Sequence, residues 1–257
     1  MKCRNKIDKW LFLQKKKISF SVEEKNLSEL KKWRISKNNI YHESGKFFRI
    51  VGIKVRTNFY KTKSWDQPVI LQKEKGILGI LRRKSKDGFQ YLIQAKVEPG
   101  NINKLQLSPT VQATKSNYSR VHKGKVVDYL SFFKKIKKNE IVINSQQSEQ
   151  GGRYLFKFNK NIIVNLNKKI KLKNNYIWLN KNDLNQLINK NNLLNMDSIS
   201  VLSCAIRKKI YDFPKNSLKQ IDHWYKNLKK KYFVKIKTIS LSHLNDWKFS
   251  KKCIYHK

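Results

Sequence analysis

Cysteine is scarce in this chain, with only Cys3, Cys204 and Cys253 among 257 residues. The count is odd, the three residues are far apart, and no pair has the spacing of metal ligands. The pattern therefore argues against a disulfide framework and against a cysteine-based metal site. It is typical of a cytoplasmic protein with free thiols.

Long apolar runs are also absent. No stretch of about 18 apolar residues occurs, so the sequence predicts no membrane-spanning helix. The N-terminus has no apolar segment followed by a small-residue cleavage site, and we expect no secretory signal. Hydrophobic residues still make up 39% of the chain and aromatic residues 12%, which is enough for a folded core. The length fits one large domain or two small ones.

Acidic residues are few, with 17 Asp and Glu against 58 Lys and Arg, and the net charge is +41. Clustered Lys and Arg can neutralise nucleic-acid phosphates. Here Lys outnumbers Arg 49 to 9, Asn occurs 26 times, and the positive charge is spread along the chain. AT-rich codons encode Lys and Asn, so a base-composition bias explains this balance, and we expect no nucleic acid and no membrane as partners. A small phosphate ester remains open, because a basic surface raises its local concentration.

The first residues of the chain return near its end. With a shift of 214 positions, residues 7–43 align with residues 221–257 without a gap and share 15 identities in 37 positions. Solenoid repeats have periods of roughly 20–50 residues, so this spacing has the length of a whole domain. It predicts a complete module in residues 1–214, followed by a linker and the truncated start of a second module in residues 215–257.

The order of the expected elements favours an α+β fold, since strands dominate the first half and helices come later. Asp87-Gly88 is a strong turn signal between two apolar runs and predicts a hairpin. Asn180 or Asn182 and Asp197 are candidate helix N-caps. Strands are expected at residues 18–24, 40–42, 47–56, 68–72, 76–81, 89–97, 104–112, 141–143 and 153–165, and helices at residues 8–13, 126–136, 182–190 and 196–210, with a linker at 211–220.

Uncharged polar residues are concentrated in a few short sequence motifs, called strings below, in which Lys is less frequent than elsewhere in the chain. Gln, Asn, Ser and Thr beside apolar strands need hydrogen-bond partners when they are buried, so these strings form either a structural network or a polar ligand site. The strings are W-D-Q-P at residues 65–68, Q-A-K-V-E-P-G-N at 94–101, L-S-P-T-V-Q-A-T-K-S-N-Y at 107–118, Q-S-E-Q-G at 147–151 and N-M-D at 195–197.

These strings resemble the NDP-hexose 2,3-dehydratase family of deoxysugar biosynthesis. Their order matches the family over about residues 20–207, and several independent strings make the resemblance specific. It implies two similar modules in tandem, each with a Nudix-like α+β fold in which helices flank a mixed sheet. The catalytic Nudix signature is absent, so the implied likeness is one of fold alone.

The resemblance implies elimination of water across C2 and C3 of a dTDP-linked or similar NDP-4-keto-6-deoxy-hexose. The C4 ketone acidifies the C3 proton, a base removes it, and the C2 hydroxyl leaves from the enolate with help from an acid. The product becomes a 3,4-diketo-2,6-dideoxy sugar. Such a site needs a base, an acid and donors for the enolate oxygen, and we expect no metal or other cofactor. The alternative is a truncated, non-catalytic half that binds the nucleotide sugar.

Glu98, Glu149 and Tyr118 are the candidate catalytic residues. Because the chain has only 17 acidic residues, a carboxylate inside a motif is informative, and either Glu could be the acid or the base. Glu98 could instead be a turn residue, and Glu149 could be a buried partner of Arg153 or Lys96. Tyr118 could donate to the enolate oxygen or take the C3 proton, or it could be a core tyrosine.

The candidate substrate-binding residues come from the same strings. Arg153, which follows two glycines, suits a pyrophosphate, and Trp65 could stack on a nucleobase. An ion pair and core packing are their respective alternative roles. As partners we expect the nucleotide sugar, and a second module or a homodimer. The full set is Trp65, Gln67, Lys96, Asn101, Thr110, Gln112, Asn117, Gln147 and Arg153.

Overall fold

The computed structural model describes residues 6–114, 116, 126–206, 215–250 and 252–257. The chain forms two compact units, and each is assembled from segments that are distant in the sequence. Unit 1 consists of residues 1–23, 75–147 and 159–211, and unit 2 consists of residues 24–74, 148–158 and 212–257. One boundary between the units, between residues 211 and 212, lies close to the predicted module boundary after residue 214, and the division into a complete module and a truncated second module stays a prediction.

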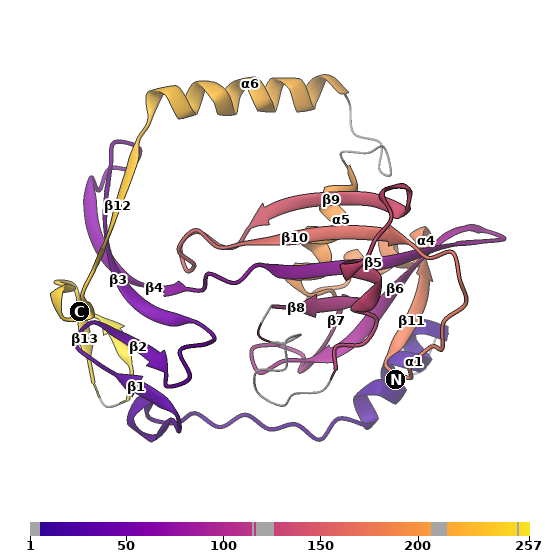
Figure 1. Cartoon of the computed structure of the whole chain (residues 1–257), viewed down its shortest axis with the longest axis horizontal. Coiled ribbons are helices and arrows are strands. Elements are labelled where there is room, and N and C mark those ends of the chain that lie inside the picture. The colour runs from indigo at the N-terminus through magenta and orange to yellow at the C-terminus, as the bar shows by residue number, and fades with distance from the viewer. Residues whose placement is uncertain (1–5, 115, 117–125, 207–214, 251) are drawn as a thin grey trace. The chain divides into compact units, whose positions relative to one another are not determined.

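Unit 1 is built on a seven-stranded sheet (Figure 1). Its main path is β11-β6-β5-β10-β9, and two further strands, β7 and β8, pair with β6 and β5 respectively. The β5–β10 pair is parallel, whereas β6 is antiparallel to β5, β7 and β11. The strands are β5 (Gly76–Ser85), β6 (Gly88–Val97), β7 (Leu105–Pro109), β8 (Val111–Ala113), β9 (Ile141–Ser148), β10 (Phe158–Asn165) and β11 (Tyr176–Asn180).

Both faces of this sheet are buried, because neighbouring residues of its central strands point to opposite faces and are both apolar. Ile80 and Leu81 of β5 are fully buried, but they belong to two different hydrophobic clusters. The cluster around Ile80 includes side chains of α1 (Lys6–Lys16), α4 (Lys181–Ile188) and α5 (Met196–Ile206). The cluster around Leu81 includes Phe133 of the short helix α3 (Ser131–Lys134).

The hairpin of β5 and β6 opens into a fork. Near its turn the two strands pair directly, up to the pair Leu81–Leu92. Beyond this point β7 pairs with β6 and β8 pairs with β5, so the chain from β7 to β8 fills the fork. Thr110, between β7 and β8, bonds both sides, since its hydroxyl accepts from Leu81 N at 3.0 Å and donates to Leu92 O. One side chain thus replaces a ladder bond of the hairpin.

Several predicted elements of unit 1 are confirmed. The predicted hairpin closes through a turn at Lys86-Asp87, and Gly88 follows as the first residue of β6 at φ +104°, a conformation that glycine adopts at no steric cost. Asn180 caps α4, since its side chain accepts from Asp183 N at 2.8 Å. The strand predicted at 104–112 is two strands, because the chain turns from β6 to β5 at Thr110.

Two predictions in unit 1 are wrong. The helix expected at 126–136 is only the four residues of α3 within the described part of that segment. Tyr129 has φ 59°, in the left-handed region that interrupts a right-handed helix, and its hydroxyl donates to Lys171 O at 2.8 Å. Asp197 does not cap α5. Asn195 does, because its Oδ1 accepts from Ser198 N at 2.9 Å.

Unit 2 contains a five-stranded sheet in which β3 is central. One edge of β3 pairs with β4, and the other pairs first with β2 and then with β12. The strands are β1 (Trp33–Ile35), β2 (Asn39–His42), β3 (Arg49–Thr57), β4 (Ser64–Leu71) and β12 (Val234–Ile239), with the separate hairpin β13 (Trp247–Phe249) and β14 (Ile254–His256). Short 3₁₀ helices occur at η1 (Leu27–Glu29) and η3 (Leu241–His243), and in unit 1 at η2 (Lys138–Glu140).

The linker predicted at 211–220 is helical from residue 215 onwards, where α6 (Lys215–Lys231) begins, and residues 211–214 lie outside the described residues. The strand predicted at 18–24 is also wrong, since residues 18–26 belong to no strand of the described chain. A strand needs a partner to satisfy its backbone groups, and none of the described residues pairs with this segment. Its counterpart in the repeat, β12, does have one.

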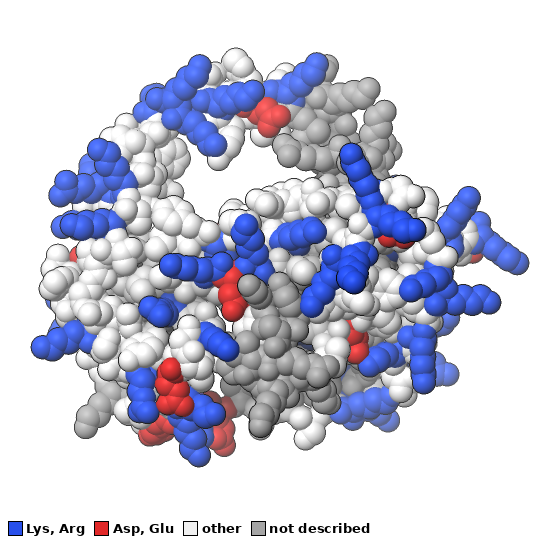
Figure 2. Space-filling model, in the orientation of Figure 1, with Lys and Arg blue, Asp and Glu red and all other residues white. Residues whose placement is uncertain are grey.

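On the face that Figure 2 shows, the positive charge is not gathered into one stripe. Figure 2 shows Lys and Arg side chains scattered among uncharged residues over elements of both units. The expectation of no nucleic-acid partner stays a prediction.

Gly79 tests the packing of α3 on the sheet. A Cβ at this position would lie 2.4 Å from a ring carbon of Phe133, so Gly79→Ala is expected to lower the free energy of unfolding by about 1–3 kcal/mol through overpacking. Gly100→Ala is the control, because nothing lies within 4 Å of its added Cβ. Urea unfolding measures both, and equal midpoints would contradict the described packing.

Candidate functional site

Three residues from two motif strings, Lys96, Glu98 and Gln112, meet at the end of β6. Lys96 Nζ donates to Glu98 Oε1 at 2.9 Å. Gln112 Nε2 of β8 donates to the same carboxylate, at 3.1 Å to Oε1 and 3.4 Å to Oε2. The side chains of Lys96 and Glu98 are 26% and 32% exposed, so the network is half-buried and open to a ligand. The Glu98 carboxylate therefore accepts hydrogen bonds from one ammonium group and one amide group.

The network continues into the start of α5. Asn195 Nδ2 donates to Gln112 Oε1 at 2.9 Å. Both ends of the Gln112 amide are therefore engaged, and its orientation toward Glu98 is fixed. Asn195 is itself held by its cap on Ser198 and by a backbone bond from its N–H to Leu107 O at 2.9 Å.

Asn101 lies at the turn that follows Glu98. Its Nδ2 donates to Lys104 O at 3.1 Å and to Lys96 O at 3.5 Å. These bonds fold the Pro-Gly turn back on β6 and fix where Glu98 leaves the strand. Asn101 thus supports the site through the backbone, and its amide is committed to the turn.

The fork of the hairpin brings these residues together. Gln112 lies on β8 beside Leu78 of β5, and Lys96 lies on β6 beside Gln106 of β7. Because β7 and β8 fill the space between β5 and β6, Gln112 reaches the end of β6 across the fork. Sequence reasoning named Lys96, Glu98 and Gln112 but interpreted Asn195 as a helix start. Its signal was the N-M-D string, which accompanies the other motifs.

Thr110 is placed inside the fold and away from solvent. It is 1% exposed, its hydroxyl bonds two backbone groups, and its carbonyl accepts from Tyr176 Oη at 3.3 Å. Burial raises the pKa of Tyr176, so that hydroxyl remains a donor near neutral pH. The observed contacts of Thr110 are structural.

The remaining described candidates, apart from Gln147, lie in unit 2. Trp65 Nε1 donates to Gln67 Oε1 at 2.8 Å, and Gln67 Nε2 donates to Gly152 O at 2.9 Å. These bonds tie β4 to the loop that carries Glu149 and Arg153. Arg153 is exposed, and its carbonyl accepts from Ile70 N at 2.7 Å. Glu149 is partly exposed, and its N–H donates to Lys157 O at 2.9 Å.

Three of the predicted positions are not joined to either network by the described contacts. Gln147, at the end of β9, is exposed and donates to Ser145 Oγ at 3.1 Å. Tyr118 and Asn117 lie outside the described residues. The two candidate carboxylates, Glu98 and Glu149, belong to different units.

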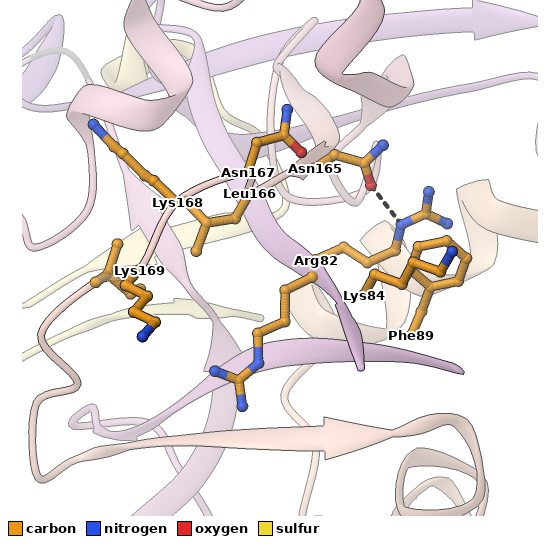
Figure 3. A pocket seen from close by; sticks show the side chains of 10 residues that line it. Arg82, Lys84, Phe89, Asn165, Leu166, Asn167, Lys168 and Lys169 are labelled. Carbon is orange, nitrogen blue, oxygen red and sulfur yellow. Dashed lines mark hydrogen bonds between the residues drawn. The ribbon is translucent and has the colours of Figure 1, made fainter. Parts of the chain in front are cut away.

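A basic pocket of about 780 Å³ lies at the other end of the β5–β6 hairpin (Figure 3). Arg82 donates from Nε to Asn165 Oδ1 at 2.9 Å and stacks on the ring of Phe89. Phe89 and Glu98 are nine residues apart, about 30 Å along an extended chain, so this pocket is separate from the Glu98 network. Its lining is Arg82, Arg83, Lys84, Phe89, Asn165, Leu166, Asn167, Lys168, Lys169 and Ile170.

Metal ligands do not cluster in the described part of the chain, where no group of three or more His, Cys, Asp or Glu could hold an ion. The expectation of a metal-free reaction stays a prediction. Among the described helices none is long and apolar enough to cross a membrane.

The strings that build the Glu98 network are those that suggested a family. A family model described as NDP-hexose 2,3-dehydratase matches residues 4–205. The chain belongs to the NDP-hexose 2,3-dehydratase family. The match covers all of β5 to β8 and most of α5, so the complete Glu98 network lies within the part that the family shares.

Three curated relatives are each named dTDP-4-dehydro-6-deoxy-alpha-D-glucopyranose 2,3-dehydratase. The protein of Saccharopolyspora spinosa is 32% identical over 262 residues, covering 93% of this chain and 54% of the relative. That of Amycolatopsis orientalis is 34% identical over 254 residues, with 96% and 54% covered. That of Streptomyces violaceoruber is 36% identical over 234 residues, with 86% and 53% covered. The chain spans about half the length of these relatives.

Substitutions at Thr110 distinguish a structural role of its hydroxyl from a role in substrate binding. Thr110→Val keeps the shape but leaves Leu81 N and Leu92 O without their hydroxyl partner, and each buried unsatisfied group costs about 1–3 kcal/mol. We expect a loss of about 2–4 kcal/mol in the free energy of unfolding, measured in urea. Thr110→Ser keeps the hydroxyl and is the matched control. A Thr110→Val protein as stable as the Ser variant would contradict the structural role.

Proposed function

We propose that this chain carries a 2,3-dehydratase site for an NDP-4-keto-6-deoxy-hexose, with dTDP as the nucleotide. The observation that carries the proposal is the Glu98 network, in which three motif strings supply one half-buried carboxylate with an ammonium and an oriented amide. Membership of the family and the names of the relatives support the substrate class.

The proposed reaction needs proton transfer beside a carbonyl. A carboxylate such as Glu98 can remove the C3 proton that the C4 ketone acidifies, or in its protonated form can assist the C2 hydroxyl as it leaves. Lys96 provides a positive charge next to the carboxylate, and such a charge also stabilises an enolate oxygen. Elimination across C2 and C3 then gives an enol that becomes the 3,4-diketo-2,6-dideoxy sugar.

The other predicted residues take supporting roles in this proposal. Arg153 and the two glycines before it suit the pyrophosphate, because a guanidinium and exposed backbone amides both donate to phosphate oxygens. Glu149 is the second proposed acid or base, and Tyr118 is a proposed donor to the enolate oxygen. Trp65 is proposed to lie against the nucleobase.

The wider organisation is also part of the proposal. We infer a cytoplasmic enzyme with a Nudix-like module, organised as a tandem repeat, that works as a homodimer or together with a second module. The repeat of residues 7–43 and the length of the relatives support the tandem arrangement. The second candidate function is a non-catalytic half that binds the nucleotide sugar, and it is favoured by the same difference in length.

Glu98→Gln tests the catalytic role directly. The 257-residue chain is incubated with dTDP-4-keto-6-deoxyglucose, and formation of the 3,4-diketo sugar is followed by NMR. We expect Glu98→Gln to lower kcat by about 100-fold or more, the size of a general acid–base contribution, while the dissociation constant of the sugar nucleotide changes little. Asp87→Asn, at the exposed hairpin turn, is expected to match the unsubstituted chain.

Two other outcomes separate the candidates. Binding of the sugar nucleotide with no turnover in the unsubstituted chain supports the non-catalytic half. Turnover that is unchanged by Glu98→Gln and lost in Glu149→Gln moves the acid–base role to unit 2 and contradicts the assignment to Glu98.

A further inference from the structure

The repeated opening segment folds in the same way twice. In the β1–β2 hairpin Trp33 stands opposite His42, and in the β13–β14 hairpin Trp247 stands opposite His256. Both Trp–His pairs are edge-to-face, with ring centroids 5.6 and 5.3 Å apart. The 3₁₀ helices η1 and η3 also differ by the repeat distance of 214 residues. The two copies share one local structure, register by register.

The two copies also bind each other symmetrically. Leu27 N donates to Lys252 O at 3.4 Å, and Leu241 N donates to Asn38 O at 3.2 Å. In the repeat Leu27 corresponds to Leu241 and Asn38 to Lys252, so this is the same bond made twice with the copies exchanged. Reciprocal contacts of this kind are the signature of a two-fold interface. The cluster between the copies contains matching residues from each, among them Leu27, Trp33 and Ile40 with Leu241, Trp247 and Ile254.

One strand breaks this symmetry. In the second copy β12 pairs with β3, from Val234 opposite Thr57 to Ile239 opposite Gly52. The equivalent of β12 in the first copy is residues 20–25, which belong to no strand of the described chain. By the same two-fold relation, residues 20–25 would pair with a second-copy counterpart of β3, and the repeat distance of 214 residues numbers such a counterpart beyond residue 257.

The opening helices of the two copies, α1 and α6, also depart from the two-fold symmetry. In α1 the side chains of Ile7, Leu11 and Gln14 are buried against the body of unit 1, and Trp10 Nε1 donates to Asn174 O at 3.2 Å. The counterparts on α6 are Ile221, Tyr225, Leu228 and Trp224. Three of these are open to solvent: Ile221 at 52%, Tyr225 at 52% and Trp224 at 61%. An exposed apolar face on an amphipathic helix marks a surface suited to packing on another body.

We propose that two modules of this kind exchange their opening strands around the two-fold interface. The helix of each copy packs on the body of its own module, and the strand that follows it pairs with β3 of the other module. In this chain β12 shows one half of the exchange. The other half is formed by residues 20–25 with the β3 of a second module, and that module's body covers the apolar face of α6.

The occupant is a second module continuous with residues 221–257, and a second copy of this chain does not fit. In every copy of this chain β3 is already covered, by β4 on one edge and by β2 and β12 on the other. A homodimer therefore offers residues 20–25 no open β3 edge. The relatives, of which this chain spans about half, have the length for the second module. The proposal stands on the repeat and does not depend on the chemistry of Glu98.

Hydrogen exchange measured by mass spectrometry tests the exchange of strands. In the 257-residue chain the amides of β12 are expected to be protected and those of residues 20–25 to exchange freely. In an extended chain, with a second copy of residues 44–211 placed after Lys257, residues 20–25 are expected to gain protection of at least tenfold. Protection of residues 20–25 equal to that of β12 in the shorter chain overturns the proposal. Free amide exchange of residues 20–25 in the extended chain also overturns the proposal. This holds whether the added copy folds or not, because the proposed pairing with residues 20–25 completes the sheet of that copy.

Matched variants give a second readout. Val22→Pro/Glu23→Pro and Ile236→Pro/Lys237→Pro change equivalent positions, and adjacent prolines remove one ladder N–H whichever residue faces β3. In the 257-residue chain only the second pair is expected to lower the thermal midpoint. In the extended chain both pairs are expected to lower it. The exchange is contradicted if Val22→Pro/Glu23→Pro leaves the thermal midpoint of the extended chain unchanged. It is also contradicted if both double variants lower the midpoint of the 257-residue chain equally.

Discussion

The bridge that Thr110 makes between Leu81 and Leu92 is the contact on which the rest of unit 1 depends. A two-stranded hairpin normally keeps its strands together over their whole length. Here a single buried hydroxyl takes the place of a ladder bond at the fork, and β7 and β8 enter the space beyond it. Gln112 then lies across from the end of β6, where it can orient Glu98. The position of Gln112 beside Glu98 thus depends on a buried hydroxyl that bonds two backbone groups.

The sequence predicted the elements that local pattern specifies. The β5–β6 turn is confirmed because Asp-Gly has few alternatives to a tight turn, and the cap at Asn180 because a short polar side chain before a helix has one obvious use. The Glu98 network could be named in part, since its residues share motif strings. The fork itself could not be predicted, because the run 104–112 carries no signal for a change of partner at Thr110.

The failures have a common physical cause, which is that tertiary partners override local pattern. Apolar residues at helical spacing in 126–136 pack on the sheet around a left-handed Tyr129 and form only the four-residue helix α3 in place of one continuous helix. Residues 18–24 have the pattern of a strand, and their counterpart β12 is one. Such a segment becomes a strand only where another strand offers it an unpaired edge. Sequence pattern reports the preference of a segment, and only the fold supplies its partner.

In the proposed reaction, with Glu98 as the base, transfer of the C3 proton to Glu98 is the step that joins this geometry to dehydration. The chain is held in D₂O with dTDP-4-keto-6-deoxyglucose, and the C3 proton of the sugar is followed by NMR. This measurement detects formation of the enolate even where elimination is slow. We predict loss of the C3 signal with the unsubstituted chain and its persistence with Glu98→Gln. Equal loss of the signal with both proteins, or a signal that persists with both, would contradict the role of Glu98 as the base.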